Sequence, residues 1–191
     1  MYKRQVDCSE FKKFSKKKAR SKLGFSDNDF IVLFVGNAAW VKGLRYVAKA
    51  VKQVPNAKLA VVGIGENRLV RELLGENVLF FGSIPHSKLA EFYSASDVLC
   101  VPSVYEAFGL MYAEAACFGL PSIACKGTGA EEIIEDGRNG FLVEKRNINQ
   151  IRGAIEKVAK QKSFKKPGFF SWSAVSQKVK AVYENLYRDV K

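Results

Sequence analysis

The chain has 191 residues, with 31 Lys and Arg against 19 Asp and Glu, and a formal net charge of +12 at pH 7. Hydrophobic residues make up 48% and aromatic residues 12%, a composition typical of a globular protein that excludes a disordered chain. The length fits a single domain spanning residues 1–191, and no apolar run reaches the roughly 20 residues of a membrane-spanning helix. Because the amino terminus lacks the apolar core of a secretory signal, we expect a cytoplasmic protein.

Basic residues gather between Lys12 and Lys22, between Lys157 and Lys166, and again near Lys180. Charge runs of this kind are usually the solvated faces of amphipathic helices. The alternative interpretations are peripheral contact with an anionic membrane at its inner surface, and contact with nucleic acid. No recognition-helix, RNP-like or zinc-finger pattern accompanies the charge, so nucleic acid comes last among them.

The four cysteines, Cys8, Cys100, Cys117 and Cys125, show no close paired spacing. Three of them lie in apolar segments, so we expect reduced, structural thiols. With one histidine, His86, the sequence supports neither a zinc site nor a Cys and His nucleophilic pair. The surrounding PHS indicates the start of a helix, where this histidine would be a loop or first-turn residue, with a nucleotide contact left open.

Taken in chain order, six short apolar runs recur at the spacing of β-α units. They are FIVLFVG, KLAVVG, VLFFG, DVLCVPS, PSIAC and GFLVE. Between them, segments such as LRYVAKAVKQV and SKLAEFYSA carry apolar residues at helical intervals. This alternation predicts an α/β fold, a doubly wound, Rossmann-like parallel sheet with its ligand beyond the carboxyl ends of the strands. We expect a linker and helix over 1–23, the core over 30–145 and closing helices over 147–191.

Five glycines lie just beyond the predicted strands, where glycine permits tight turns and a close approach of the backbone to a ligand. They are Gly36, Gly63, Gly65, Gly82 and Gly109. GIGENR begins like a dinucleotide fingerprint but carries Arg68 at the third glycine position, and no GxxxxGK[ST] phosphate loop is present. These two patterns argue against a nicotinamide site and against hydrolysis of ATP or GTP.

The helix predicted to begin at Phe108 to Leu110 offers the best phosphate site, because unpaired amides and the helix dipole attract anions there. A diphosphate fits this position. Lys42, in GNAAWVKG after the first strand, can reach the same edge and add a positive charge for phosphate oxygens. Its alternative interpretation is an ordinary exposed lysine.

Glu114 is the only charged residue between Glu106 and Lys126. A buried carboxylate needs hydrogen-bond partners, and no Lys, Arg or His lies within a helical turn of it. The partner therefore comes from elsewhere in the fold or from a ligand, and we favour a pocket in which two ribose hydroxyls donate to Glu114. Glu106 would face the opposite end of that ligand, or else cap the helix as an acid stabilised by its dipole.

The two glutamates, separated by seven residues in PSVYEAFGLMYAEAACFGLP, resemble the signature of family 4 retaining glycosyltransferases. FVGNAAWVKGL, VVGIGE, FFGSIPHSKLAEFYSASDVLCVPS and GTGAEEIIEDGRNGFLV resemble further blocks of that family in order, from Val6 to Val143, and FSWSAV resembles its closing helix. The resemblance implies the carboxyl-terminal, donor-binding half of a GT-B fold, with the amino-terminal acceptor domain missing or separately encoded. It implies transfer from a UDP- or GDP-linked sugar with retention of configuration, and neither a metal ion nor another cofactor.

The same resemblance implies roles for individual residues. Glu106 would contact hydroxyls of the donor sugar and Lys42 would neutralise the departing diphosphate, which makes these two the expected catalytic residues. Glu114 would bind the ribose, and Ile84 would lie against the base. The other expected substrate contacts lie at strand ends and at the helix start: Gly36, Asn37, Phe108, Gly109 and Leu110.

The chain departs from the family pattern at Asn37, where an arginine is usual, and in the short SFKKPGF that precedes FSW. Residues 1–5 look like an arbitrary start, and a donor-binding half alone is expected to transfer sugar poorly or not at all. The alternatives are a non-catalytic nucleotide-sugar-binding module or a subunit of a split transferase, followed by a basic nucleic-acid binder. The base, the sugar and the acceptor stay open.

Overall fold

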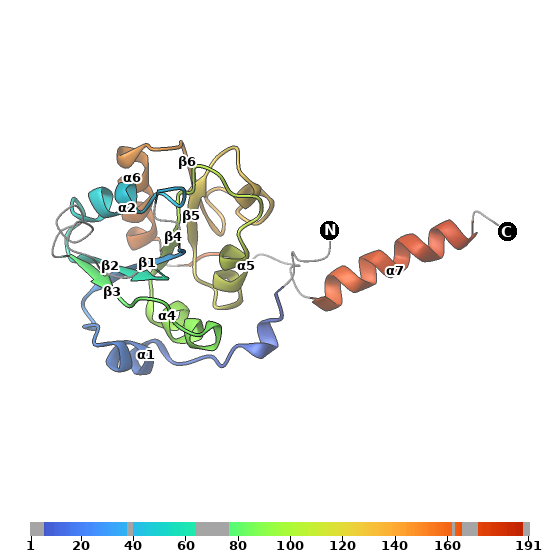
Figure 1. Ribbon diagram of the computed structural model, residues 1–191, viewed down its shortest axis with the longest axis horizontal. Coiled ribbons are helices and arrows are strands. Elements are labelled where there is room, and N and C mark those ends of the chain that lie inside the picture. The colour runs from blue at the N-terminus through green and yellow to red at the C-terminus, as the bar shows by residue number, and fades with distance from the viewer. Residues whose placement is uncertain (1–5, 38–39, 64–76, 162, 166–171, 189–191) are drawn as a thin grey trace.

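The protein is represented by a computed structural model, which describes residues 6–37, 40–63, 77–161, 163–165 and 172–188. The described strands form one parallel sheet in the order β3-β2-β1-β4-β5-β6, with helices on both faces (Figure 1). The strand order reverses direction between β1 and β4, as in a doubly wound sheet. The predicted Rossmann-like α/β fold is therefore confirmed.

All six predicted strands are present. They are β1 Phe30–Val35, β2 Ala57–Val62, β3 Val78–Phe80, β4 Val98–Cys100, β5 Ser122–Cys125 and β6 Gly140–Val143. The apolar side chains of the central strands are buried on both faces, which is why these runs show no polar alternation.

The helices form two layers. On one side lie α2 Leu44–Val51 and α6 Ile148–Lys160, and on the other lie α1 Lys16–Leu23 and α4 Leu89–Ala95, with α5 Leu110–Cys117 beside α4 (Figure 1). The described ranges also contain three 3-10 turns, η1 Cys8–Glu10, η2 His86–Lys88 and η3 Gly129–Glu132. The last helix, α7 Trp172–Arg188, lies apart from the sheet in Figure 1. None of the helices in the described ranges combines the length and apolar content that a bilayer crossing requires.

Part of the basic cluster of α1 is structural rather than solvated. Arg20 is buried, and its guanidinium donates to the carbonyl of Ala95 at 3.0 Å and to Asp97 at 2.7 Å. Asp97 also pairs with Lys16 and accepts the amide of Ile31 at 2.6 Å. This arrangement fastens α1 to the end of α4 and to the start of the sheet.

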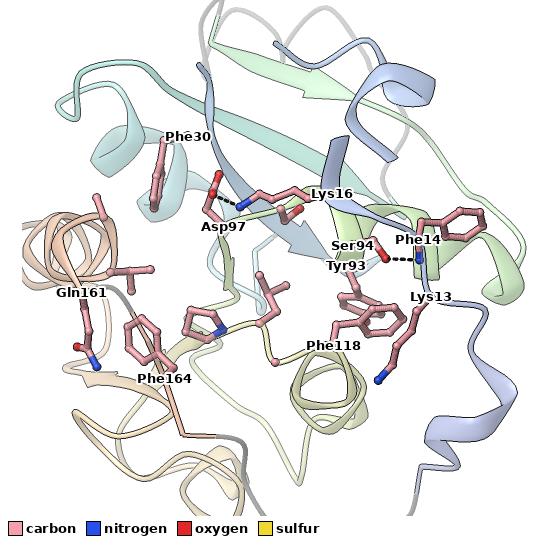
Figure 2. Close-up of a pocket in the computed structure, with 16 residues that line it drawn as sticks. Lys13, Phe14, Lys16, Phe30, Tyr93, Ser94, Asp97, Phe118, Gln161 and Phe164 are labelled. Atoms are coloured by element: carbon pink, nitrogen blue, oxygen red, sulfur yellow. Dashed lines mark hydrogen bonds and ion pairs between the residues drawn. The ribbon is translucent and has the colours of Figure 1, made fainter. Parts of the chain in front are cut away.

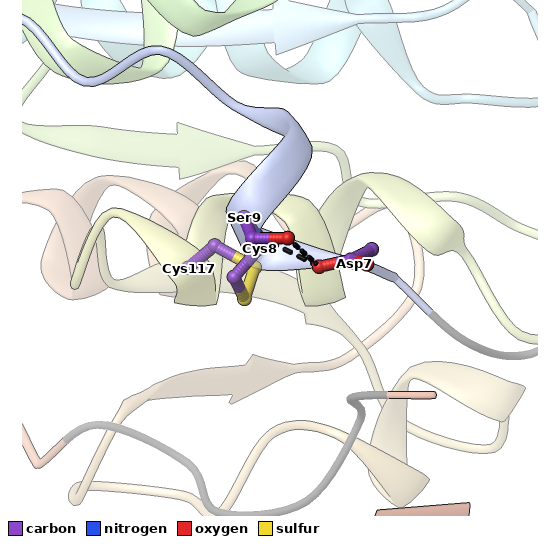
Figure 3. The surroundings of a disulfide bond; sticks show 4 residues. All are labelled: Asp7, Cys8, Ser9 and Cys117. Atoms are coloured by element: carbon purple, nitrogen blue, oxygen red, sulfur yellow. Dashed lines mark hydrogen bonds between the residues drawn. A yellow bond between two sulfur atoms is a disulfide. The ribbon is translucent and has the colours of Figure 1, made fainter. Parts of the chain in front are cut away.

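Cys8 and Cys117 form a disulfide across 109 positions, with their Cα atoms 5.4 Å apart (Figure 3). The expectation that all four cysteines are reduced is therefore wrong for this pair. Sequence spacing gave no sign of the bond because only the fold brings η1 to the end of α5. The other two cysteines, Cys100 and Cys125, are buried free thiols.

A cavity of about 560 Å³ opens at the amino ends of the strands (Figure 2). Phe30, Asp97 and Pro121, which lie at or just before the starts of β1, β4 and β5, line it. Two charged groups on its wall, Lys16 and Asp97, form an ion pair with each other (Figure 2). This cavity lies at the sheet edge opposite to the one where the nucleotide site is expected.

Candidate functional site

The loops that follow β1 and β4 meet at the carboxyl edge of the sheet. The amide of Val104 donates to the carbonyl of Val41 at 2.8 Å. Gly43 has a φ of 79°, and a side chain there would collide with the carbonyl of Pro102. Glycine is therefore required at a contact that brings together the loops carrying the two expected catalytic residues.

Lys42 and Glu106 form an ion pair at this contact. Lys42 Nζ lies 2.6 Å from Glu106 Oε2, and Ser103 Oγ donates to the same oxygen at 3.2 Å. The stem of Lys42 crosses Gly36, whose missing side chain leaves room for it. The structure thus brings three predicted site residues, Lys42, Glu106 and Gly36, together at one point of the carboxyl edge of the sheet.

The helix α5 begins directly beside this pair. Gly109, with a φ of 81°, precedes Leu110, and within the described residues no side chain caps the helix by a hydrogen bond. The N-cap residue of α5 is thus Gly109 and not Glu106, and the interpretation of Glu106 as an acid stabilised by the helix dipole stays open. The first amides of an α-helix have no partner inside the helix, so this end of α5 attracts anions. No three His, Cys, Asp or Glu side chains of the described ranges are grouped as a metal ion would need.

The turn η3 supports the Glu106 loop from its other side. The amide of Gly129 donates to the carbonyl of Glu106 at 2.8 Å. A Cβ at Gly129 would collide with the carbonyl of Ala107, so the two backbones are in direct contact. Three loops, from β1, β4 and β5, therefore fix the position of Glu106.

Glu114 lies in the second turn of α5 and is 8% exposed. The hydroxyl of Tyr93 donates to its Oε2 at 2.6 Å, and Nε2 of His86 lies 2.9 Å from its Oε1. Our preference for a ligand as the source of its donors, over a partner elsewhere in the fold, is therefore wrong. Burial of this carboxylate does not by itself identify a ribose site, and the ribose assignment stays a prediction.

Tyr93 is a site residue that the sequence analysis missed, and His86 was noted there without a partner. His86 begins η2 at the start of α4, where the sequence indicated it, and Tyr93 follows within α4. Burial, together with the Glu114 carboxylate, raises the pKa of the Tyr93 hydroxyl well above 10.0. One signal was available, because a tyrosine in the apolar pattern SKLAEFYSA needs a polar partner for its hydroxyl.

The other predicted residues lie along the same edge. The amide of Gly63 donates to the carbonyl of Gly82 at 2.7 Å, and its α-carbon packs against the backbone of Gly36. Ile84 is half-buried against the core, whereas Asn37 is exposed. Phe108 and Gly109 are buried, and Leu110 is 40% exposed. Gly65 and Arg68 lie outside the described residues.

Comparison with known proteins gives a consistent result. A family model described as glycosyl transferases group 1 matches residues 15–167. An uncharacterized glycosyltransferase of Methanocaldococcus jannaschii is 30% identical over 86% of this chain and 47% of its own length. Sucrose-phosphate synthase from Thermosynechococcus elongatus superimposes with a TM-score of 0.81 at 29% identity, covering 97% of this chain and 52% of that one.

A second similar structure is that of Anabaena HepE in complex with UDP-glucose. Its TM-score is 0.72 at 27% identity, over 82% of this chain and 46% of that chain. The chain thus spans about half the length of the proteins that it matches. Since the family model covers most of the sequence and the fold agrees with GT-B glycosyltransferase structures, the chain belongs to the group 1 glycosyl transferases.

Proposed function

We propose that this chain is the donor-binding half of a retaining glycosyltransferase that uses a UDP- or GDP-linked sugar. The observation that carries the proposal is the Lys42–Glu106 pair, 2.6 Å apart, at the uncapped start of α5. A cation, a carboxylate and a helix amino terminus at one point suit a diphosphate joined to a sugar.

The chemistry follows from the charges. A diphosphate at the start of α5 draws the ammonium of Lys42 away from Glu106, whose carboxylate then accepts hydrogen bonds from hydroxyls of the sugar. As the glycosidic bond breaks, negative charge grows on the departing diphosphate. Lys42 and the first amides of α5 stabilise that charge in place, so this proposal assigns no step to a metal ion.

Glu114 completes the donor site by accepting hydrogen bonds from the ribose. Its location, one turn beyond the start of α5, supports this role, because helical side chains tilt toward the amino terminus and so toward the diphosphate. Ile84, half-buried at the same edge, provides an apolar wall for the base.

The similarity to HepE, whose structure contains UDP-glucose, supports a nucleotide-sugar donor. The similar proteins are about twice as long as this chain, which supports a second half that binds the acceptor. Without that half, acceptor positioning and exclusion of water are lost, so we propose that the isolated chain transfers sugar poorly or not at all.

Calorimetry with uridine and guanosine diphosphates, without added magnesium, tests the donor site. We expect one of them to bind and Glu114→Ala to abolish most of that binding, because ribose hydroxyls lose their acceptor. The control is Glu91→Ala, which removes another buried glutamate, a residue of α4 that pairs with Lys22 of α1. Unchanged affinity in Glu114→Ala refutes the ribose assignment, and the absence of binding by either diphosphate refutes the donor site.

The second candidate is a nucleotide-sugar-binding module, either without catalysis or as a subunit of a split transferase. Asn37, which stands where an arginine is usual in the family pattern, favours this candidate, because one positive charge for the diphosphate is missing there. Joining the chain to the reading frame that precedes it in its genome, and assaying release of nucleotide diphosphate from a panel of nucleotide sugars, separates the two. Turnover only in the joined protein supports the transferase, and binding without turnover supports the module.

A further inference from the structure

The two oxygens of the Glu114 carboxylate have partners of different kinds. Oε2 accepts the hydroxyl of Tyr93, which is 1% exposed. Oε1 faces Nε2 of His86, whose side chain is 65% exposed. One oxygen is therefore held from inside the protein, and the other is held from the side that solvent reaches.

Tyr93 is fixed in direction by its surroundings. Its ring packs against Phe118 at 5.4 Å between centroids and lies nearly perpendicular to the ring of Phe11 at 6.5 Å. Figure 2 shows the rings of Tyr93 and Phe118 side by side. Burial raises the pKa of the hydroxyl well above 10.0, so it stays protonated and remains a donor near neutral pH. Tyr93 can therefore set the orientation of the carboxylate.

His86 is held less firmly. One side of its ring contacts Phe11, at 5.5 Å between centroids, and most of the rest is exposed. An ionised carboxylate only accepts hydrogen bonds, so Nε2 of His86 is the donor in this contact. An exposed imidazole can rotate away from Glu114 without uncovering the core, which leaves Oε1 available to another donor.

We propose that Tyr93 is a positioning residue for Glu114 and that His86 is an exchangeable partner whose place at Oε1 a ribose hydroxyl takes. This inference rests on the proposed function, in which Glu114 binds the ribose. Tyr93 keeps Oε2 in place while the partner of Oε1 changes. The two residues therefore affect nucleotide binding in opposite directions.

Tyr93→Phe releases the carboxylate and weakens the hold on the ribose. Calorimetry with uridine and guanosine diphosphates and their 2′-deoxy counterparts measures this as a preference for ribose over deoxyribose. We expect that preference to fall roughly tenfold, since one buried hydrogen bond to a charged group is lost. A residue that is merely structural would lower both affinities together and leave the preference unchanged.

The matched control is Tyr112→Phe. Tyr112 is equally buried, and its hydroxyl makes a hydrogen bond of the same 2.6 Å length, but to the carbonyl of Val101 instead of to Glu114. We expect this variant to keep the ribose preference of the unaltered chain. Loss of the preference in both variants would assign the effect to packing and overturn the inference.

His86→Phe keeps an aromatic ring against Phe11 but cannot donate to Glu114. We expect roughly three- to tenfold tighter binding of the preferred diphosphate, because the competing donor is gone. The gain should vanish in a Glu114→Ala background, as a double-mutant cycle measures. Because His86 is exposed, this arm tests the inference even if Tyr93→Phe does not fold.

The results separate the two levels of the proposal. Glu114→Ala with an intact ribose preference would overturn the ribose assignment itself. A preference that is lost in Glu114→Ala but intact in Tyr93→Phe would overturn only the positioning role. Unchanged or weaker binding by His86→Phe would overturn the exchange.

Discussion

Lys42 Nζ and Glu106 Oε2 lie 2.6 Å apart although 64 positions separate the two residues in the chain. Their side chains are 21% and 10% exposed, so the pair is only partly screened by solvent. A diphosphate bound at the start of α5 would compete with Glu106 for the ammonium group. The two residues should therefore affect ligand binding differently when each is replaced.

Lys42→Met should weaken binding of uridine or guanosine diphosphate by roughly 10- to 100-fold, since charge-assisted hydrogen bonds to phosphate are lost. Calorimetry at two salt concentrations should also show a weaker salt dependence than in the unaltered chain. Lys49→Met, on the exposed side of α2, is the control for loss of one positive charge. Equal effects from both variants would show that only net charge matters.

Glu106→Gln should leave the diphosphate bound at least as tightly, because Lys42 loses its competing carboxylate. The variant should lose the preference for the sugar-bearing nucleotide, since the proposed partner of Glu106 is the sugar. Competition between UDP and UDP-glucose, or between the guanosine compounds, measures that preference. An equal loss of affinity for both forms would make Glu106 a structural residue.

Thiol titration tests the disulfide. Burial raises the pKa of Cys100 well above 9.0 and that of Cys125 to about 11, so neither thiol should react quickly in the folded protein at about pH 8. Unfolding without reductant should release two thiols, and reduction should raise the number to four. Four thiols without reductant would contradict the Cys8–Cys117 bond.

Two glycine substitutions should have opposite effects on stability. Gly129→Ala places a methyl group against the backbone of Ala107 and should destabilise the fold by about 1–3 kcal/mol. Gly153→Ala lies within α6 with open space around it and should stabilise by about 0.5–1 kcal/mol. Denaturant unfolding of both variants measures these changes. An unchanged free energy of unfolding in Gly129→Ala would indicate that η3 lies further from Glu106 than in the structure.

Asp29 should contribute to the dependence of stability on acid. Burial opposes its ionisation, but hydrogen bonds from Lys58 and from the amide of Ser26 outweigh burial and lower its pKa below 3.8. A lowered folded-state pKa stabilises the protein above the unfolded value, and this stabilisation is lost as pH falls through the folded value. The difference in free energy of unfolding between the unaltered chain and Asp29→Asn should therefore shrink below about pH 4. A difference that stays constant with pH would contradict the lowered pKa of Asp29.

The fold was largely predictable because its signal is local. The central strands are short, apolar runs that are buried on both faces, and Gly36 and Gly63 directly follow β1 and β2. Right-handed crossovers then restrict how such units can be arranged in a sheet. The edge at which Lys42, Glu106 and Glu114 lie followed from the same rule.

The partners within the site were not predictable, because they depend on contacts between distant segments. Tyr93 and His86 lie 21 and 28 positions before Glu114, and only the packing of α4 beside α5 brings them to its carboxylate. Similarly, Arg20 appears in the sequence as one more residue of a basic run, although in the structure it is buried against Asp97. The pattern of charges along the chain does not show which of the charged residues form ion pairs.

The bond between Cys8 and Cys117 has a mechanical consequence. When the two ends of the chain are pulled apart, tension passes from Cys8 directly to the last turn of α5 and bypasses the 108 residues between the two cysteines. Four of the six strands, together with Lys42, Glu106 and Glu114, lie inside this bypassed loop. The part of the protein that holds the candidate site is thus shielded from stretching, whereas β5, β6 and the closing helices would bear the load.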